Sequence, residues 1–271
     1  MTHIDYKKIS IEIRKKILKM IFNSQSSHIG SALSCVDILT VLYFRILNVD
    51  PKTPQIDNRD RFILSKGHAA SSLYATLAQK GFFSEEILNT YCKDGGRLSG
   101  HSTRGCVPGV ETSTGSLGHG IAIGAGIALA GKLECKNYRT FVLISDGECD
   151  EGSIWEAAMF AAHHKLDNLV VIIDYNKLQA FGKTNEILNL EPLKEKWLSF
   201  NWQAQEIDGH DFSQIEKTLN NIPFKKDKPS LIIAHTIKGK GISFMENKLE
   251  WHYKAPNKEE YNLAIKELDK K

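Results

Sequence analysis

Two runs of sequence decide the fold: Thr140-Phe-Val-Leu-Ile-Ser145-Asp146-Gly147-Glu148 and, one helix later, Leu169-Val-Val-Ile-Ile-Asp174-Tyr175-Asn176. Each run begins with unbroken apolar, mostly β-branched residues, which is typical of a strand buried on both faces of a parallel sheet. Between them, Ser153-Ile-Trp-Glu156 predicts a capping box at the start of a helix. The sequence therefore predicts a strand–helix–strand unit with Asp146 and Asn176 at neighbouring strand ends.

The side chains at these strand ends suit a divalent cation. Open parallel sheets bind ligands at the carboxyl ends of their strands, and Mg2+ takes oxygen ligands from the protein and from phosphate. Asp146 would supply a carboxylate, Asn176 an amide oxygen and Leu178 a backbone carbonyl, while Gly147 would let a phosphate approach the backbone. On these residues alone a second interpretation stays open, in which Asp146 only caps a turn and Asn176 only ends a strand.

Composition limits the classes of protein. The chain has 271 residues, of which 42% are hydrophobic and 25% charged, so we expect one large domain over residues 1–271. A formal charge of +3 is too small to indicate nucleic-acid binding. The five cysteines form no Cys-x-x-Cys pair, which favours a reducing compartment. No signal peptide or membrane span is predicted, so we expect a cytoplasmic protein.

Further elements extend the predicted fold on both sides of the central unit. Residues 6–22 predict an amphipathic helix with Lys and Arg outward, and Ser34 is expected to cap a second helix. Apolar residues at 61–64 and 230–234 predict two more strands, and Gln203-Ala-Gln-Glu-Ile207 predicts another. Together they predict an α/β fold, with a doubly wound, mostly parallel sheet and helices on both faces.

Histidines recur where these elements meet loops. His28 lies in a polar loop after the first helix, and His68 follows the strand at residues 61–64. His101 lies in residues 94–119, a stretch rich in Gly, Ser and Thr without periodicity, which we expect to wrap an active centre. For His28, a role as a loop histidine satisfied by a neighbouring helix end stays an equal alternative.

The central motif resembles a known family. Asp146-Gly-Glu, Glu151-Gly-Ser-Ile-Trp and Asp174-Tyr-Asn176 are similar to the thiamine-diphosphate motif of transketolases, in which an Asn follows the Asp-Gly step about thirty residues later. Here Asn176 follows Asp146 by 30 residues. The family usually has Gly where this chain has Ser145, which affects the tightness of the turn more than the metal ligands. The resemblance implies the diphosphate-binding domain of a thiamine-diphosphate-binding fold.

The resemblance also implies roles for individual residues. Thiamine diphosphate and Mg2+, or Ca2+ or Mn2+ in its place, would be the cofactors. The implied catalytic residues are His28, His101, His252 and Glu151, the last at an interface between subunits. The implied cofactor-binding residues are Ser31, His68, Gly115, Ser116, Leu117, Asp146, Gly147, Glu148, Asn176, Lys238 and His252, and the metal ligands are Asp146, Asn176 and Leu178. His119 and His235 stay undecided, and His3, His163, His164 and His210 are expected to have surface or core roles.

The length of the resemblance predicts a missing partner. It covers essentially the whole chain but only about the first half of a transketolase, without the pyrimidine-binding and C-terminal domains. We therefore predict the N-terminal subunit of a split transketolase, in an α2β2 heterotetramer with a C-terminal subunit. It would transfer a two-carbon ketol unit from a ketose phosphate to an aldose phosphate, as in pentose phosphate metabolism.

Three alternatives stay open. A specialised carboligase of sugar biosynthesis would keep all of these motifs. The α subunit of a 2-oxo acid dehydrogenase would share only the metal motif and would leave the histidine steps unexplained. A non-catalytic subunit that binds a diphosphate for regulation is the third alternative.

Overall fold

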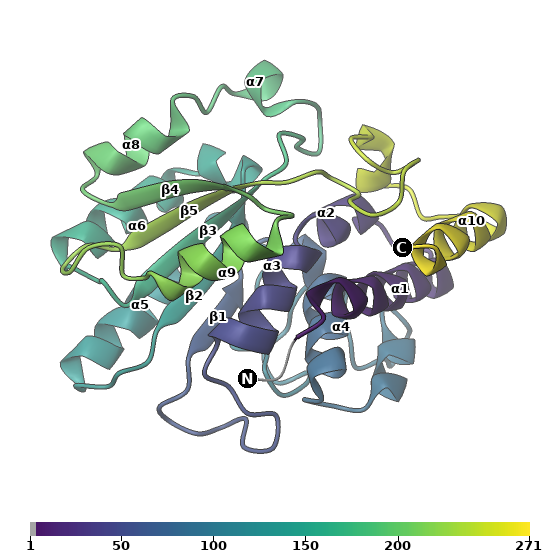
Figure 1. The fold of residues 1–271 in the computed structure, drawn as a ribbon, viewed down its shortest axis with the longest axis horizontal. Coiled ribbons are helices and arrows are strands. Elements are labelled where there is room, and N and C mark those ends of the chain that lie inside the picture. Colours follow the sequence, from purple (N-terminus) through teal and green to yellow (C-terminus); the bar gives the residue numbers. More distant parts are fainter. Residues whose placement is uncertain (1–3) are drawn as a thin grey trace.

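A parallel sheet of five strands forms the centre of the fold in the computed structural model, which describes residues 4–271 (Figure 1). Its strands run in the order β1-β2-β3-β5-β4, and every pairing between them is parallel. Their bounds are β1 Arg61–Leu64, β2 Thr140–Ser145, β3 Leu169–Tyr175, β4 Gln203–Asp208 and β5 Ser230–His235. Because the strands share one direction, their carboxyl ends meet at a single edge of the sheet.

Ten α-helices pack around this sheet in the described part of the chain. Their bounds are α1 Tyr6–Ser24, α2 Ile29–Ser34, α3 Val36–Val41, α4 Ala70–Lys80, α5 Gly120–Leu133, α6 Gly152–His163, α7 Thr184–Ile187, α8 Leu193–Ser199, α9 Phe212–Asn220 and α10 Lys258–Asp269. A π-helical turn extends α3 over Leu42–Ile46, and 3-10 turns lie at Gly67–Ala69, Glu85–Thr90, Gly147–Asp150 and Leu249–His252. No helix within residues 4–271 is long and apolar enough to cross a membrane.

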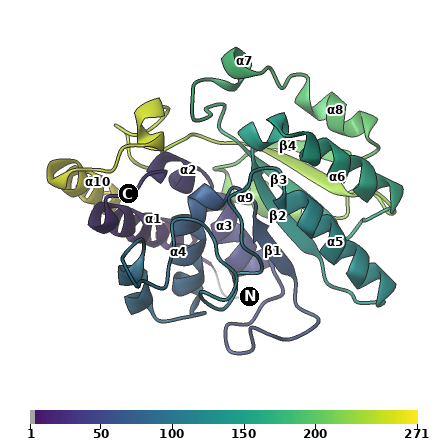
Figure 2. The same cartoon turned by 180° about the vertical axis from the view of Figure 1, so that it is seen from behind.

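The two faces of the sheet are covered by different helices (Figures 1 and 2). Along β2, Phe141 and Leu143 pack in the layer that contains α1, α3, α4 and α9. Val142 and Ile144 pack in the opposite layer, with α5, α6 and α8. Successive side chains of a strand point to opposite faces, so an unbroken apolar run feeds both layers. The predicted doubly wound sheet is confirmed.

Close packing of α5 on the sheet explains its small residues. A Cβ atom at Gly124 would lie 2.4 Å from Cγ2 of Val142, and one at Gly120 would lie 2.3 Å from Oγ of Ser65. Both distances are shorter than carbon contacts allow. These glycines therefore set how closely α5 approaches β1 and β2.

Two local predictions about helix starts were wrong. The capping box at Ser153 does not form: α6 begins at Gly152, and the Ser153 hydroxyl donates to the carbonyl of Gly118 at 3.0 Å. Ser34 does not cap the second helix either, because it ends α2 and its hydroxyl donates to Asp174 at 2.5 Å. In both cases the serine hydroxyl donates a hydrogen bond to a residue distant in sequence and does not cap the helix start that the local pattern predicted.

The prediction that all Lys and Arg residues of the first helix point outward was also wrong, because Arg14 is buried. Arg14 is only 4% exposed, and its guanidinium forms a two-pronged pair with Asp37, at 2.9 and 2.8 Å. The same carboxylate contacts Nδ1 of His210 at 2.8 Å. A buried cation is stable only where an anion pairs with it, and Asp37 lies on α3, outside the helix whose pattern was considered.

Candidate active site

A pocket of about 360 Å³ lies at the carboxyl edge of the sheet. Its lining residues are His28, Ser31, Lys66, His68, His101, Gly115, Leu117, Ser145, Asp146, Gly147, Asp150, Glu151, Asn176, Leu178, Gln179, Ala180, Phe181 and His252. Most residues that the sequence singled out therefore surround one cavity. They come from the end of β2, from the segments that follow β1, β2 and β3, and from segments more than 200 residues apart, such as those of His28 and His252.

Three of the singled-out residues lie outside this lining. Ser116 is exposed on the neighbouring loop. Glu148 is buried beneath the pocket, where its carboxylate accepts the N–H groups of Ser145 at 2.8 Å and Gly118 at 3.1 Å. Lys238 is also buried, with Nζ at 3.0 Å from Nδ1 of His252. Glu148 and Lys238 thus touch residues beside the pocket without facing it.

Four histidine rings cluster in the pocket. The ring centroid of His28 lies 5.0 Å from that of His252, 5.3 Å from that of His68 and 6.1 Å from that of His101. The rings of His68 and His252 are 5.8 Å apart. Four imidazoles at these distances can contact a single small ligand from several sides.

The enclosed histidines are held neutral at pH 7. Burial, followed by the positive charges around it, lowers the pKa of His28 to about 4. Burial and the ammonium of Lys238 lower the pKa of His252 to about 3, and burial with Lys66 holds the pKa of His68 well below its usual value. A neutral imidazole carries one donor and one acceptor, so each ring can give or accept a hydrogen bond.

The contact with Lys238 fixes the tautomer of His252. An ammonium group has donors only, so Nδ1 of His252 accepts from Nζ of Lys238 and the ring proton lies on Nε2. Burial, followed by the charge of Lys66, lowers the pKa of Lys238 to about 8. Lys238 also donates to the carbonyl of Leu178 at 3.0 Å. It thereby links the histidine cluster to the chain that follows β3.

His28 is held in an unusual backbone conformation. Its φ of 75° and ψ of 16° lie in the left-handed region, which costs a side chain with a Cβ about 1–2 kcal/mol. Its N–H donates to the carbonyl of His252 at 2.8 Å, and α2 begins at the next residue. Strained residues of this kind cluster at functional sites, where the surrounding structure holds them in place. Here the strain turns the imidazole toward the other three rings.

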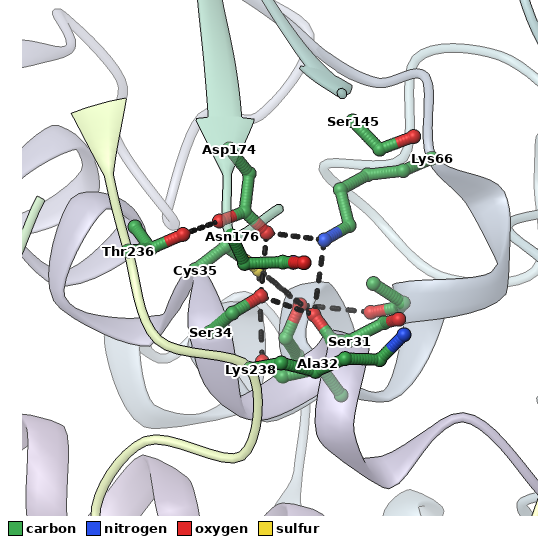
Figure 3. Close-up of polar contacts among 12 residues, drawn as sticks. Ser31, Ala32, Ser34, Cys35, Lys66, Ser145, Asp174, Asn176, Thr236 and Lys238 are labelled. Carbon is green, nitrogen blue, oxygen red and sulfur yellow. Dashed lines mark hydrogen bonds and ion pairs between the residues drawn. The ribbon is translucent and has the colours of Figure 1, made fainter. Parts of the chain in front are cut away.

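A buried network around Asp174 supports the floor of the pocket (Figure 3). Its carboxylate accepts from Ser34 at 2.5 Å, and from Lys66 and Thr236 at shorter contacts. Lys66 also donates to the carbonyl of Ser31 at 3.0 Å. Asp174 thus ties α2, the chain after β1 and the chain after β5 to the end of β3. We call these five residues the strand-end network.

Lys66 and Asp174 keep opposite charges inside the protein. Burial acts to lower the pKa of Lys66, but the carboxylate of Asp174 outweighs it and the net shift is upward. Burial acts to raise the pKa of Asp174, but Lys66 and three hydrogen bonds outweigh it and the net shift is downward. Lys66, which lines the pocket, is therefore a fixed cation. Sequence reasoning missed it, although a lysine directly after a buried strand was the available signal.

Three oxygen donors at the pocket fit a hard divalent cation: the Asp146 carboxylate, the Asn176 amide oxygen and the backbone carbonyl of Leu178. The Asp146 carboxylate accepts the N–H groups of Gly147 at 2.8 Å and Lys177 at 2.6 Å, which fix its position. The amide oxygen of Asn176 accepts from the N–H of Leu178 at 3.0 Å. Each oxygen keeps a second lone pair for a metal. Burial, followed by the charge of Asp174, raises the pKa of Asp146 to about 6, so a cation bound beside this carboxylate would favour its charged form.

The protein alone does not complete a metal site. Within residues 4–271 no cluster of three or more His, Cys, Asp or Glu side chains is arranged to hold a metal ion. One carboxylate, one amide and one carbonyl leave half of an octahedral shell for other oxygens. Mg2+ commonly takes these from phosphate groups, and Lys66 and Lys238 supply the matching positive charge. The donor set therefore fits a cation that carries a diphosphate.

The loop at residues 94–119 reaches the pocket through two glycines. A Cβ atom at Gly67 would lie 2.6 Å from the backbone N of Gly115, and one at Gly115 would lie 2.9 Å from Cδ2 of His101. Gly115 has a φ of 139°, which favours glycine. These contacts press the loop onto the turn that carries His68. The exposed ring of His101 is thereby added to the cluster.

Sequence reasoning also missed the wall formed by Asp150, Gln179, Ala180 and Phe181. Nε2 of Gln179 donates to one carboxylate oxygen of Asp150 at 2.8 Å, and the other oxygen is buried without a hydrogen-bond partner. Phe181 lines the pocket with 78% of its surface exposed. The only sequence signal for this wall was that Asp150 lies four residues after Asp146 of the Asp-Gly step.

The remaining histidines lie elsewhere. His119 is the last residue of the loop and contacts the carbonyl of Leu117 at 3.2 Å, and His235 pairs with Glu206 at 2.8 Å. His210 is enclosed between Asp37 and the N–H of Ile237, which donates to its Nε2 at 2.9 Å. His163 and His164 are exposed at the end of α6. His3, for which a surface or core role was expected, lies outside the described residues.

Hard oxygen donors beside two buried lysines define the class of this site, which suits a diphosphate held through a divalent cation. Comparison with known proteins identifies the family. The family model for the transketolase thiamine diphosphate binding domain matches residues 6–269. The chain therefore belongs to the transketolase family.

Two similar proteins are named as subunits of transketolases. One, from Phocaeicola vulgatus, belongs to an apulose-4-phosphate transketolase and is 45% identical over 258 residues, which are 95% of this chain and 92% of that protein. The 6-deoxy-6-sulfo-D-fructose transketolase subunit SqwG of Clostridium sp. is 43% identical over 258 residues, or 95% of this chain and 94% of that protein. Each has nearly the same extent as this chain.

Solved transketolases share the fold. The structure of transketolase from Campylobacter jejuni superposes with a TM-score of 0.91 at 31% sequence identity. The match covers 99% of this chain and 43% of the Campylobacter chain. The chain thus spans less than half the length of that transketolase and has the α/β fold of its thiamine-diphosphate-binding part.

Proposed function

We propose that this chain is the N-terminal subunit of a split, thiamine-diphosphate- and Mg2+-dependent transketolase. Residues 1–271 would form one diphosphate-binding domain, and catalysis would need a second chain. The enzyme would transfer a two-carbon ketol unit from a ketose phosphate to an aldose phosphate. The observation that carries the proposal is the pocket in which three oxygen donors, a fixed lysine and four histidines meet.

The donor set supports the assignment of the metal and the diphosphate. Asp146, Asn176 and the carbonyl of Leu178 would hold the cation, and Gly147 would lie beside the phosphates. His68 and Nε2 of His252 carry neutral imidazole donors for phosphate oxygens, and hydrogen bonds to charged groups contribute about 1.5–3 kcal/mol each. When bound, thiamine diphosphate supplies the nucleophilic carbon and the electron sink for cleaving a bond beside a carbonyl.

The other pocket residues support roles in substrate handling. His28 and His101 would hold substrate hydroxyls and move protons between them, for which neutral imidazoles are suited. Ser31, Gly115, Ser116 and Leu117 would lie against the cofactor. Lys238 would act on the diphosphate through its contact with His252, and Glu148 would hold the turn around Ser145. Glu151 would face the partner chain where the active centres meet.

Exposed apolar side chains around the pocket support a partner chain. Phe181, Ile187 and Leu188, in the segment after β3, are 78%, 44% and 55% exposed. Apolar groups gathered beside a site are typical of a protein interface. We propose that the C-terminal subunit covers this surface in an α2β2 heterotetramer.

The names of similar proteins support a class of donor substrate. Pentose phosphate metabolism is our first candidate for the pathway. The second candidate is a dedicated sugar pathway, which is favoured by the relatives named for apulose-4-phosphate and for 6-deoxy-6-sulfo-D-fructose. Both names describe a sugar with an anionic group, so we propose an anionic ketose as donor. We also propose a cytoplasmic location, which the five free cysteines support.

Ketol transfer should be measured with the chain alone and with its partner. We expect turnover only in the mixture, with thiamine diphosphate and Mg2+ both required. His28→Ala and His101→Ala should each lose turnover while cofactor affinity, measured by calorimetry, stays within about twofold, since neither is assigned to the diphosphate. Unchanged turnover in both variants would contradict the proposal. Cofactor binding without turnover of any ketose would indicate a regulatory subunit instead.

A further inference from the structure

A second pocket, of about 520 Å³, lies away from the candidate active site. Its lining residues are Gln55, Asp57, Arg59, Arg61, Arg97, Arg104, Gly105, Val107, Pro108, Gly109, Val110 and Glu111. It shares no lining residue with the candidate active site. We call it the arginine pocket, because four of these residues are arginines.

The arginine pocket lies toward the amino end of β1. Arg61 is the first residue of that strand, and Lys66 of the active site follows its other end. Four strand residues at about 3.3 Å each separate these two ends by roughly 13 Å. The loop at residues 94–119 spans both sites, because it gives His101 to one pocket and Arg97 and Arg104 to the other. The sites are separate but share a loop.

Two of the arginines are fixed in place. The guanidinium of Arg59 pairs with both carboxylate oxygens of Glu111, and its side chain is only 12% exposed. Arg61 donates to the carbonyls of Arg59 and Asp57, and its guanidinium lies 4.7 Å from the ring centroid of Tyr138. Such contacts prevent these cations from turning away into solvent. They form a rigid, positively charged wall.

One donor of this wall lacks a partner. Nε of Arg59 is buried without a hydrogen bond, although guanidinium N–H groups are strong donors. The side chains of Arg97 and Arg104 are exposed and make no hydrogen bond or ion pair with any residue in 4–271. The loop opposite the fixed wall therefore offers exposed guanidinium donors to a ligand in the pocket.

The charges of the pocket do not balance. Four arginines face two carboxylates, those of Asp57 and Glu111, which leaves an excess of two positive charges. A phosphate monoester carries about −1.5 to −2 charges at pH 7, and arginine suits it because its donors match phosphate oxygens in pairs. The volume lies in the range of pockets that enclose small molecules. With a net charge of only +3, the chain does not favour an acidic polymer such as nucleic acid.

We propose that the arginine pocket binds a small phosphate monoester, such as a sugar phosphate, at a site separate from catalysis. Arg59 and Arg61 form the fixed side of this site, and Arg97 and Arg104 close on the ligand from the loop. Because the same loop carries His101, the bound ligand restrains a segment that reaches the active site. The proposal does not depend on the function proposed for the other pocket.

Calorimetric titration of the full chain tests the proposal. The probes are ribose 5-phosphate and inorganic phosphate, with ribose as the neutral control. We expect both phosphates to bind more tightly at low than at high salt, and ribose not to bind. In Arg97→Ala/Arg104→Ala, affinity should fall at least about tenfold, since charge-assisted contacts are lost. Lys225→Ala/Lys226→Ala removes two exposed charges near the start of β5 and should bind like the unaltered chain.

A second pair of measurements assigns the binding to the arginine pocket. His28→Ala changes the active site outside the shared loop and should retain the affinity for ribose 5-phosphate. Hydrogen exchange at residues 94–105 should slow when ribose 5-phosphate is added. Absence of binding at millimolar phosphate, or equal affinity in the double arginine variant, would overturn the proposal. Because no turnover is measured, these results are independent of whether ketol transfer occurs.

Discussion

The strand-end network and the loop at residues 94–119 meet at the same pocket, but they are built in opposite ways. In the network, Lys66, Ser34 and Thr236 all donate to the buried carboxylate of Asp174. In the loop, the hydroxyls of Ser102 and Thr114 are buried without a hydrogen-bond partner. The network is a closed set of satisfied groups, and the loop is not.

This difference indicates a division of labour. A satisfied buried network resists displacement, so it can hold oxygen donors in place for a cation and a diphosphate. A loop with unsatisfied groups, attached by the close contact of Gly67 with Gly115, can be displaced at lower cost. We therefore assign the anchoring of the cofactor to the sheet edge and the contact with changing substrates to the loop.

The largest effect is expected from breaking the network. Lys66→Met leaves the Asp174 carboxylate buried without its cation, which should lower the free energy of unfolding by about 3–5 kcal/mol. Urea denaturation measures this loss. Lys225→Met, at an exposed lysine, should change it by less than about 0.5 kcal/mol. If Lys66→Met were as stable as that control, the network would not support the sheet edge.

The next effect concerns the metal. Asp146→Asn keeps the shape of the side chain but removes its charge, so the affinity for thiamine diphosphate with Mg2+ should fall about 10–100-fold, the loss of one charge-assisted ligand. Calorimetry at fixed Mg2+ measures the change. Asp94→Asn, the same substitution at an exposed position in the loop, should leave the affinity unaltered. An equal loss of affinity in both variants would contradict the assignment of cofactor anchoring to the sheet edge and not to the loop.

A smaller effect follows from the pKa shifts. The pKa of His28 lies near 4 in the folded chain and near 6.5 when unfolded, so the unfolded chain binds more protons between these values. Stability is therefore fully present above pH 6.5 and falls as the pH drops, by about 1–2 kcal/mol from His28 at pH 5. His28→Gln should flatten the pH dependence of urea unfolding. A pH dependence that stays equally steep in His28→Gln would contradict this assignment.

The smallest effect on stability is expected in the loop. His101→Ala removes an exposed ring and should change the free energy of unfolding by less than about 0.5 kcal/mol. Ketol transfer should nevertheless be lost, because His101 lines the pocket and we propose that it holds substrate hydroxyls. The matched variant His235→Ala, at a histidine outside the pocket, should keep both stability and turnover. Loss of stability in His101→Ala would place the loop among the anchoring elements.

Much of the sheet edge could be predicted from the sequence. The apolar runs before Asp146 and Asp174 predict strands buried on both faces, and parallel strands necessarily bring their ends to one edge. The glycine-rich loop that carries His101 and Gly115 was also predictable as part of a site, because a long aperiodic segment within a compact domain is commonly functional. Periodicity and strand direction were sufficient for these features.

Pairings between distant segments could not be predicted in the same way. Ser34 donates to Asp174 across 140 residues, and Lys66 pairs with it across 108. Local patterns predicted that Ser34 and Ser153 cap helices, because a helix cap is a hydrogen bond to backbone groups only a few residues away. The choice between cap and distant partner depends on tertiary contacts, which a single sequence does not display. Arg14 shows the same limit, since its partner Asp37 lies on another helix.

The most direct test of ketol transfer by this subunit follows the carbons themselves. The chain and its partner would be incubated with thiamine diphosphate, Mg2+, an acceptor aldose phosphate and a ketose phosphate labelled with 13C at its first two carbons. We predict a product that is two carbons longer than the acceptor and carries both labels together, and much less of this product in Asp146→Asn when thiamine diphosphate is limiting. Label released as a one-carbon fragment, or kept in the donor while the cofactor is bound, would contradict the account.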